Sequence, residues 1–343
     1  MCCNTNPKYK TMNRPTIKDV ANKAGVSVGL VSMVLNAKRD ENGKFNCPVK
    51  EETAQKVLDA VRELDYKANR QAAGLRRGKM KTIAVIVPDI SNKFFADIAG
   101  HLEEAAFKEG YTVIFCSSSE SVERLSSLVD SLYSSNVDGM IIAPCANSER
   151  IVKKTSEMGI KVVIMDRLLP GLDHIPSIAL DNIRAGAMAA RSFSRRGCTK
   201  IGVICYDTMI SSLRDRIEGF KQEADRLGME HCVTFLPYNS GTEVFKTTIS
   251  TVLGSGADAL FFPSNNAAVK GLAVANTLGL SIPGDIAYLG FDDCDVFEVY
   301  SPRIPHISQS TKEFGEESFR MLIDLIEGRE VSSKVLEPVL VND

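Results

Sequence analysis

Polar side chains stand directly after four apolar segments of this chain. Each segment has the run of branched residues typical of a buried strand in a parallel sheet, for example KVVIM before Asp166 and AYLGF before Asp292. Open sheets of this kind bind small molecules beyond the carboxyl ends of their strands. We therefore expect a ligand site built from these strand ends. The candidates are Asp89, Asp166, Arg167, Asn265, Asn266, Asp292 and Asp293.

Asp and Asn at strand ends also cap the helices that follow. For Asp293 and Asn266, a cap remains the alternative role. Arg167 has its own alternative, a structural ion pair with neighbours of Asp166.

A second kind of chemistry is indicated by the charge distribution. Residues 1–81 hold 17 Lys and Arg against 8 Asp and Glu, a net charge of +9, whereas the rest of the 343-residue chain carries −11. A basic head on an acidic body points to a polyanion partner for the head alone, most often nucleic acid. The alternative is a chance cluster of solvated lysines.

The head has the pattern of a helix-turn-helix. Residues 16–36 contain two helix starts, at Thr16 and Ser27, separated by Gly25, and residues 51–65 predict a third helix. The polar stretch 37–48 predicts a loop. With the apolar positions of the second helix turned inward, its outward positions are Val28, Gly29, Ser32, Met33 and Asn36.

From Thr82 onward, seven apolar strands alternate with amphipathic stretches. This alternation predicts an α/β fold, and two doubly wound lobes suit its length better than a single barrel, which stays the minority alternative.

The sequence lacks the motifs typical of metal binding, phosphate binding and nucleophilic catalysis. The nine Cys and four His have no metal-ligand spacing, and the glycine-rich phosphate, dinucleotide and nucleophile motifs do not occur. We therefore expect no enzyme, no metal and no cofactor. No apolar run is long enough for a membrane span, and the N-terminus has no apolar leader core, so we expect a cytoplasmic protein without membrane attachment.

Six motifs in order now point to one family. TIKDVANKAGVSVGLVSMVLN, ANRQAAGLRRGK, TIAVIVPDISNKFFADI, VVIMDR, LRDRIEGF and DIAYLGFDD together resemble the lactose/galactose repressor family of bacterial transcription regulators, from about Pro15 to the carboxyl end. The resemblance implies a helix-turn-helix headpiece at 15–66, a hinge helix at 67–81, and a two-lobed core at 82–343. This core resembles periplasmic sugar-binding proteins, forms a homodimer and binds a small effector between its lobes. Residues 1–14 would be a disordered extension.

The resemblance also implies which residues meet double-stranded operator DNA. Family members usually carry polar side chains, often an Arg, at the positions that match Val28, Gly29 and Met33, so readout of guanine by Arg is not available here. Val28 and Met33 offer apolar contacts to thymine methyl groups, or alternatively pack against loop 37–48. The expected phosphate contacts are Thr16, Ser27, Ser32 and Asn36.

In the expected hinge, Asn69 begins the helix and Leu75 matches the leucine that wedges into the minor groove. Arg70, Arg76 and Arg77 would neutralise phosphates. A solvated basic linker is the alternative, but it leaves Leu75 exposed without a reason.

For the effector, the resemblance adds Phe94, Phe95, Tyr238 and the Arg216 of an R-x-x-G-F motif. The expected set is then Asp89, Phe94, Phe95, Asp166, Arg216, Tyr238, Asn265 and Asp292. Carboxylates, amides, a guanidinium and aromatic faces suit a polyol, so we expect a sugar or sugar acid. Ligand-driven lobe closure would then alter how the two hinges of a dimer are presented.

Two alternatives for the function remain beside the expected repressor. One is a regulator that responds to a nucleobase or another non-sugar metabolite. The other is an architectural DNA-binding protein with weak sequence preference, which the apolar second helix favours. A periplasmic transport receptor would need a leader peptide and no DNA-binding head, and the sequence meets neither requirement.

Overall fold

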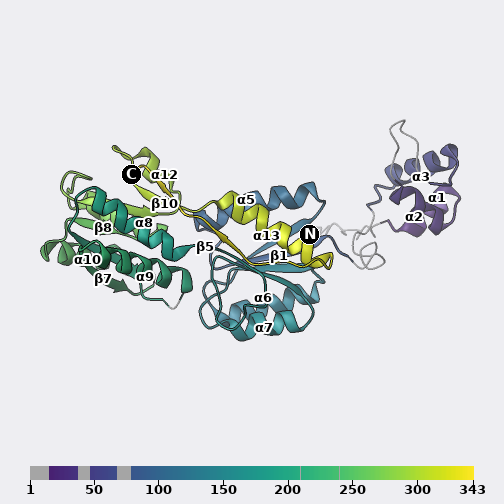
Figure 1. Cartoon of the computed structure of the whole chain (residues 1–343). Coiled ribbons are helices and arrows are strands. Elements are labelled where there is room, and N and C mark those ends of the chain that lie inside the picture. The colour runs from purple at the N-terminus through teal and green to yellow at the C-terminus, as the bar shows by residue number, and fades with distance from the viewer. Residues whose placement is uncertain (1–14, 38–46, 68–78, 209, 239) are drawn as a thin grey trace, which may run out of the picture. The chain divides into compact units, whose positions relative to one another are not determined.

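The computed structural model describes residues 15–37, 47–67, 79–208, 210–238 and 240–343. Its contacts divide the chain into two units, Met1–Met80 and Lys81–Asp343 (Figure 1). Three expectations lie outside the described residues: the extension at 1–14, nearly all of loop 37–48, and the hinge contacts. The hinge residues concerned are Asn69, Arg70, Leu75, Arg76 and Arg77.

The described part of the first unit is a three-helix domain. Its helices are α1 (Ile17–Ala24), α2 (Val28–Asn36) and α3 (Glu51–Glu63). They share one small core, in which Val20, Val31 and Val57 are buried. The helix starts match the sequence pattern: the backbone N–H and the hydroxyl of Thr16 both donate to Asp19, and the Ser27 hydroxyl accepts from the Leu30 N–H. The predicted helix-turn-helix is therefore confirmed.

The second unit consists of two lobes, and the first lobe is built on a six-stranded parallel sheet. The strands are β1 (Thr82–Val87), β2 (Thr112–Ser117), β3 (Gly139–Ile142), β4 (Lys161–Met165), β5 (Ser177–Leu180) and β11 (Lys334–Leu336), in the order β11-β5-β4-β3-β1-β2. One face is covered by α5 (Lys93–Lys108) and α13 (Thr311–Ile326), and the other by α6 (Val122–Ser134) and α7 (Glu149–Glu157) (Figure 1).

The second lobe repeats this plan. Its sheet contains β6 (Lys200–Tyr206), β7 (Glu230–Leu236), β8 (Ala259–Phe261), β9 (Ala287–Phe291), β10 (His306–Ser308) and β12 (Val339–Val341), in the order β12-β10-β9-β8-β6-β7. Only β12 runs antiparallel to its neighbour among these strands. The helices α8 (Asn182–Arg195) and α9 (Ser211–Arg226) cover one face, α10 (Thr242–Gly254) and α11 (Asn265–Thr277) the other, and the short α12 spans Asp295–Val299.

The two sheets confirm the doubly wound lobes and exclude the barrel. All seven predicted strands form, and β5, β7, β10, β11 and β12 were not predicted. Within residues 81–343 the chain passes between the lobes after β5, after β10 and between β11 and β12. In the part of the chain that the structure describes, no helix combines the length and apolarity needed to cross a bilayer.

Two glycines set the distance between α8 and α9. A Cβ atom on Gly186 would lie 1.9 Å from the Arg216 carbonyl oxygen. A Cβ atom on Gly219 would lie 2.0 Å from the Ile183 carbonyl oxygen. Backbone therefore packs directly on backbone, which fixes the position of Arg216 on α9. The glycine of the R-x-x-G-F motif thus has a packing role, since only a residue without a side chain fits.

We expect Gly219→Ala to lower the unfolding free energy by about 3 kcal/mol, because the two helices must separate to admit the methyl group. Gly100→Ala is the matched control: Gly100 lies within α5 with nothing close to its Cβ position, and the same change there should be neutral or stabilising. Chemical denaturation of both variants is the measurement. Equal stability of the two variants would contradict the close helix contact.

Candidate ligand cleft and DNA-binding helix

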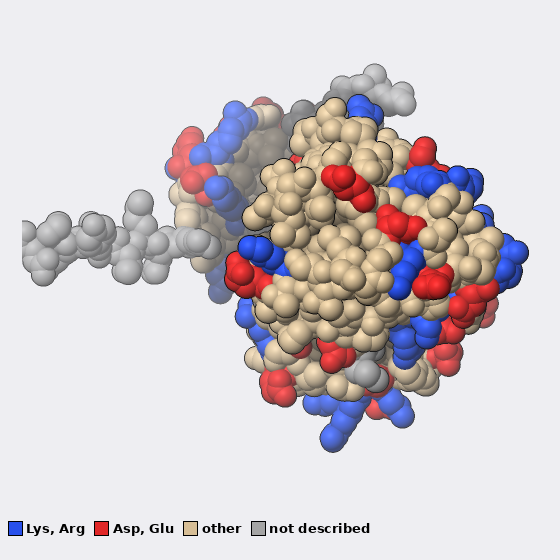
Figure 2. All heavy atoms as spheres, turned by 90° about the vertical axis from the view of Figure 1, so that its left-hand side faces the viewer, with Lys and Arg blue, Asp and Glu red and all other residues tan. Residues whose placement is uncertain are grey.

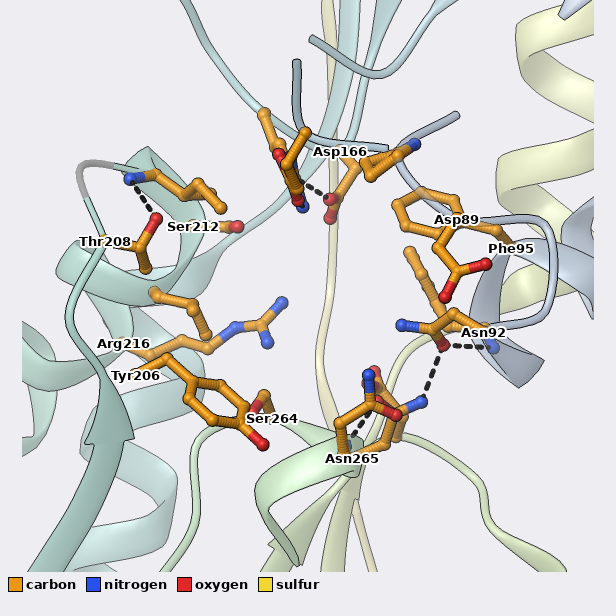
Figure 3. A pocket seen from close by; sticks show the side chains of 18 of the residues that line it. Asp89, Asn92, Phe95, Asp166, Tyr206, Thr208, Ser212, Arg216, Ser264 and Asn265 are labelled. Atoms are coloured by element: carbon orange, nitrogen blue, oxygen red, sulfur yellow. Dashed lines mark hydrogen bonds and ion pairs between the residues drawn. The ribbon is translucent and has the colours of Figure 1, made fainter. Parts of the chain in front are cut away.

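A cleft lies between the lobes, at the carboxyl ends of the strands of both sheets. It has a volume of about 680 Å³, including the part open to solvent. Side chains from both lobes point toward the same opening (Figure 3). All eight residues of the expected effector set line it: Asp89, Phe94, Phe95, Asp166, Arg216, Tyr238, Asn265 and Asp292.

Arg216 is the buried cation of the cleft, with 4% of its surface exposed. Its Nε donates to the side-chain oxygen of Asn182 at 2.8 Å, and Nη1 donates to the Pro263 carbonyl at 2.9 Å. The guanidinium carbon lies 3.7 Å from the centre of the Phe291 ring. Burial lowers the pKa of Arg216, while the charges of Asp292 and Asp166 oppose this shift. The side chain is held by the protein on three sides and presents its remaining edge to the cleft (Figure 3).

Asp166 and Asp292 are the first residues after β4 and β9, and both are almost fully buried. Each has a left-handed backbone, with φ of +68° and +64°. Such a conformation costs free energy in a residue with a side chain and is found preferentially at functional sites. Burial raises the pKa of Asp292 to about 6, although Arg216 and a hydrogen bond from Gln309 act in the opposite direction. Burial also raises the pKa of Asp166.

Arg167 is engaged by a partner that the sequence did not indicate. Its Nη1 and Nη2 donate to the two carboxylate oxygens of Glu120 at 2.9 and 2.8 Å, and Nη1 also donates to the Pro144 carbonyl. Its Nε lies 3.4 Å from an oxygen of Asp166. The expected alternative, a structural ion pair, therefore describes Arg167, which lies in the cleft wall.

Aromatic rings close two sides of the cleft. Phe94 and Phe95 lie in the first turn of α5 and are buried, with ring centres 5.1 Å apart. From the second lobe, Tyr206 and Tyr238 meet edge to face at 5.6 Å, and Tyr238 is 45% exposed. Burial raises the pKa of Tyr206 to about 12. Its hydroxyl, protonated at neutral pH like that of any tyrosine, can donate a hydrogen bond to a ligand.

Hydrogen bonds and ion pairs cross between the lobes beside the cleft. Asn265 at the start of α11 donates to the side-chain oxygen of Asn92, which also caps α5 by accepting from the Phe94 N–H. The neighbouring Lys93 lies 3.6 Å from Asp295 of the second lobe. These contacts connect the two lobes at the cleft mouth.

Asn266 and Asp293, for which a helix cap was the alternative role, differ in position. Asn266 lines the cleft, whereas Asp293 accepts from the Ser308 hydroxyl and bonds the His306 ring instead. Sequence reasoning missed further lining residues: Asn92, Glu120, Tyr206, Thr208, Ile210, Ser212, Leu213, Ser264 and Gln309. Glu120 follows the predicted strand β2 closely, so extending the strand-end rule to that strand would have found it. Gln309 follows β10, which was not predicted.

In the first unit, α2 presents an apolar outer surface. Val28 is 38% exposed and Met33 is 45% exposed, and Gly29 and Asn36 are also exposed. Ser32 is half-buried, and its carbonyl accepts from the Asn36 side chain at 2.6 Å. Helix α2 contains no Lys or Arg. The helix therefore offers methyl and thioether groups, a serine and an amide to whatever it contacts.

The chemistry of the cleft is that of hydrogen bonding to a small polar molecule. It combines carboxylates, a guanidinium edge, amides and hydroxyls with aromatic rings. Among the described residues, no group of three or more His, Cys, Asp or Glu could hold a metal ion. The candidate residues at the ends of β1, β4, β8 and β9 supply most of these groups.

Comparison with known proteins agrees with this geometry. Residues 16–69 match the family of bacterial regulatory proteins of the lacI type, and residues 80–341 match periplasmic binding proteins and the sugar-binding domain of the LacI family. The ribose operon repressor of Halalkalibacterium halodurans is 30% identical over 312 residues, which cover 91% of this chain and 90% of that protein.

Two solved structures are similar over nearly the full length. The cellobiose complex of the transcriptional regulator CelR is 25% identical, with a TM-score of 0.68, and the match covers 96% of this chain and 98% of that one. The operator-bound Lac repressor dimer with the anti-inducer ONPF is 22% identical, with a TM-score of 0.81 and the same coverage. With a family model matched over most of its length, this chain belongs to the LacI family of bacterial transcription regulators.

Proposed function

We propose that this regulator is a repressor that binds operator DNA as a homodimer, and that a sugar-like effector in the cleft controls its affinity for the operator. The cleft residues, the strand-end geometry and the family membership all support this function. The relatives named for ribose and cellobiose support a carbohydrate as the class of effector.

The observation that carries the proposal is a set of buried polar atoms in the cleft wall. Within the described residues, the Ser264 hydroxyl and the side-chain oxygen of Gln309 are buried without a hydrogen-bond partner. Arg167 Nε also lacks a hydrogen bond. Buried groups of this kind are costly and are normally satisfied in folded proteins. A ligand with several hydroxyl groups would satisfy Ser264 and Gln309, whereas Arg167 Nε faces the Asp166 carboxylate at 3.4 Å.

On the DNA side, we propose that α2 enters the major groove with Val28 and Met33 toward base edges, while Thr16, Ser27, Ser32 and Asn36 contact phosphates. The exposure of Val28 and Met33 supports this arrangement. Sequence preference would then rest on apolar contacts and on the deformability of the DNA.

The proposed dimer would use the end of the second lobe that α10 and α11 form. Between residues 247 and 284 only Asp258 and Lys270 are charged. Figure 2 shows a broad uncharged area at this end of the lobe. Val244 and Val269 are exposed on α10 and α11. Depletion of charge is typical of the core of a protein interface, so a second copy is the fitting occupant. The Lac repressor structure of the same fold is itself a dimer.

We expect Asp292→Asn to weaken effector binding about 10- to 100-fold, because an amide replaces the charged acceptor of ligand hydroxyls. A thermal-shift screen of neutral sugars, including ribose and cellobiose, and of nucleobases identifies the effector. Titration of an operator fragment with and without that compound then measures the response.

The matched control for this experiment is Asp293→Asn, the same change one residue further on, where the carboxylate bonds His306 and Ser308 outside the cleft. That variant should keep the wild-type response. Unchanged effector affinity in Asp292→Asn, or stabilisation by nucleobases alone, would contradict the proposed site or the proposed ligand class.

The pKa of Asp292 also predicts a pH dependence of stability. The folded protein holds this proton up to about pH 6, whereas the unfolded chain releases it near pH 4. Stability therefore falls as the pH rises between these values, by about 3 kcal/mol in total. Asp292→Asn should remove this loss, so its melting temperature should exceed that of the wild type above pH 6 and match it at pH 4.

Asp293→Asn should change the stability at neutral pH in the opposite direction to Asp292→Asn. Burial of Asp293 is outweighed by hydrogen bonds from His306 and Ser308, which hold its pKa below the usual value. This carboxylate stabilises the fold above about pH 4, so its amide variant should be the less stable protein at neutral pH. Thermal melts from pH 4 to pH 8 measure both variants, and curves parallel to the wild type would refute the assignment.

For the DNA contact, we expect Met33→Arg to change the preferred base at one position of each half-site, since an arginine offers two donors to guanine. Gln55→Arg is the matched control. Gln55 is exposed on α3, so this substitution adds the same positive charge away from α2. That control should raise affinity for all sequences alike. Selection from a randomised DNA library measures the preference, and an identical base profile for Met33→Arg and the wild type would argue against readout by α2.

A further inference from the structure

Negative charge exceeds positive charge around the cleft. Four carboxylates line it, those of Asp89, Glu120, Asp166 and Asp292, against the two guanidinium groups of Arg167 and Arg216, and no lysine is among the lining residues that the structure describes. A ligand carrying its own negative group would therefore meet more like charges than opposite ones.

The two guanidinium groups have little left to offer an anion. Both terminal nitrogens of Arg167 donate to Glu120, one to each carboxylate oxygen, and its Nε faces Asp166. Burial lowers the pKa of Arg167, but the Glu120 and Asp166 carboxylates outweigh burial and raise it overall, so these carboxylates stabilise the charge of the guanidinium. In Arg216, Nε and Nη1 are engaged by the protein, and Nη2 remains for a ligand.

The backbone that carries Glu120 is held in a costly conformation. Ser119 and Glu120 both have left-handed backbones, with φ of +53° and +56°. The turn is anchored on both sides: the Ser119 N–H donates to the Pro88 carbonyl, and the Ser121 hydroxyl caps α6. Conformations of this kind persist where the surrounding structure enforces them, and they cluster at functional sites. The turn places the Glu120 carboxylate beside Arg167, which lies 47 residues further along the chain.

We propose that the Glu120–Arg167 ion pair is an anion filter, which restricts the cleft to uncharged polyhydroxylated compounds and rejects sugar acids and sugar phosphates. The inference rests on the proposed function, because it specifies the ligand class of the same cleft. It narrows the expectation from sequence, which included sugar acids.

Hydroxyl groups suit this arrangement because they both donate and accept. They donate to Asp89, Asp166 and Asp292, and they accept from Arg216 Nη2 and from the tyrosine hydroxyls. A carboxylate or phosphate only accepts at neutral pH, so it would leave the carboxylates without donors and face their repulsion. Breaking the ion pair would release two guanidinium nitrogens, which bind carboxylate and phosphate oxygens well.

The test is Glu120→Gln, probed with inorganic sulfate, D-gluconate and D-glucose 6-phosphate at constant ionic strength. We expect wild type to show no saturable thermal stabilisation by these anions. The variant should bind sulfate at least about tenfold more tightly than wild type, since the Arg167 guanidinium is then free to donate to the sulfate oxygens. Isothermal titration of the full-length protein gives the affinities.

Glu223→Gln is the matched control. Glu223 likewise bridges two arginines, Arg191 and Arg226, but lies outside the cleft, so this variant should behave as wild type toward all three anions. The double variant Glu120→Gln, Arg167→Gln removes both charges and should lose the sulfate binding gained by the single variant. Sulfate binding that persists in the double variant would overturn the role of Arg167.

Two further outcomes would overturn the proposal. The first is saturable binding of any of the three anions to the cleft of the wild-type protein. The second is a sulfate affinity of Glu120→Gln equal to that of Glu223→Gln. The proposed function fails separately. If no neutral sugar stabilises wild type, the cleft is not a sugar site, while the sulfate comparison still decides whether the ion pair excludes anions.

Discussion

The burial of one guanidinium group organises the second unit of this protein. Arg216 lies where the two lobes meet, stacked on Phe291 and bonded to Asn182 and to the Pro263 carbonyl. A buried cation requires nearby negative charge and complete hydrogen bonding. Two strained strand-end carboxylates supply the charge, and the close pair of α8 and α9 brings Asn182 to Nε of Arg216, while Nη2 is left for a ligand. Gly186 and Gly219 permit that pair, so the packing of α8 on α9 and the chemistry of the cleft depend on each other.

This arrangement also gives a physical basis for control by a ligand. Each lobe contributes its own sheet and its own polar strand ends, and the contacts that join the lobes at the cleft are few and polar, such as Asn92 with Asn265 and Lys93 with Asp295. A ligand that bonds both sets of strand ends would shift the balance between lobe arrangements by its difference in affinity for them. The carboxylates whose negative charge stabilises the Arg216 guanidinium would also bind the ligand, so ligand binding and lobe arrangement share one set of groups.

Much of this could be predicted from sequence because the strongest signals are local. Continuous apolar runs predicted seven strands, and the residues after them, such as Asp166 and Asp292, lie together in the cleft. The capping pattern at Thr16 and Ser27 predicted the helix-turn-helix. What was missed depends on contacts distant in sequence. Strand β10, with the sequence HIS, has no continuous apolar run, and the pairing of Glu120 with Arg167 arises only when two strand-end turns meet in space.

We propose that this cleft binds an uncharged polyol through Arg216 and the carboxylates beside it. A crystal structure of the protein with the neutral sugar that stabilises it most tests this claim directly. We expect ligand oxygens within about 3 Å of Arg216 Nη2 and of the Asp292 carboxylate, with the Glu120–Arg167 pair intact. A sugar bound elsewhere, or one that reaches neither Arg216 nor Asp292, would contradict it.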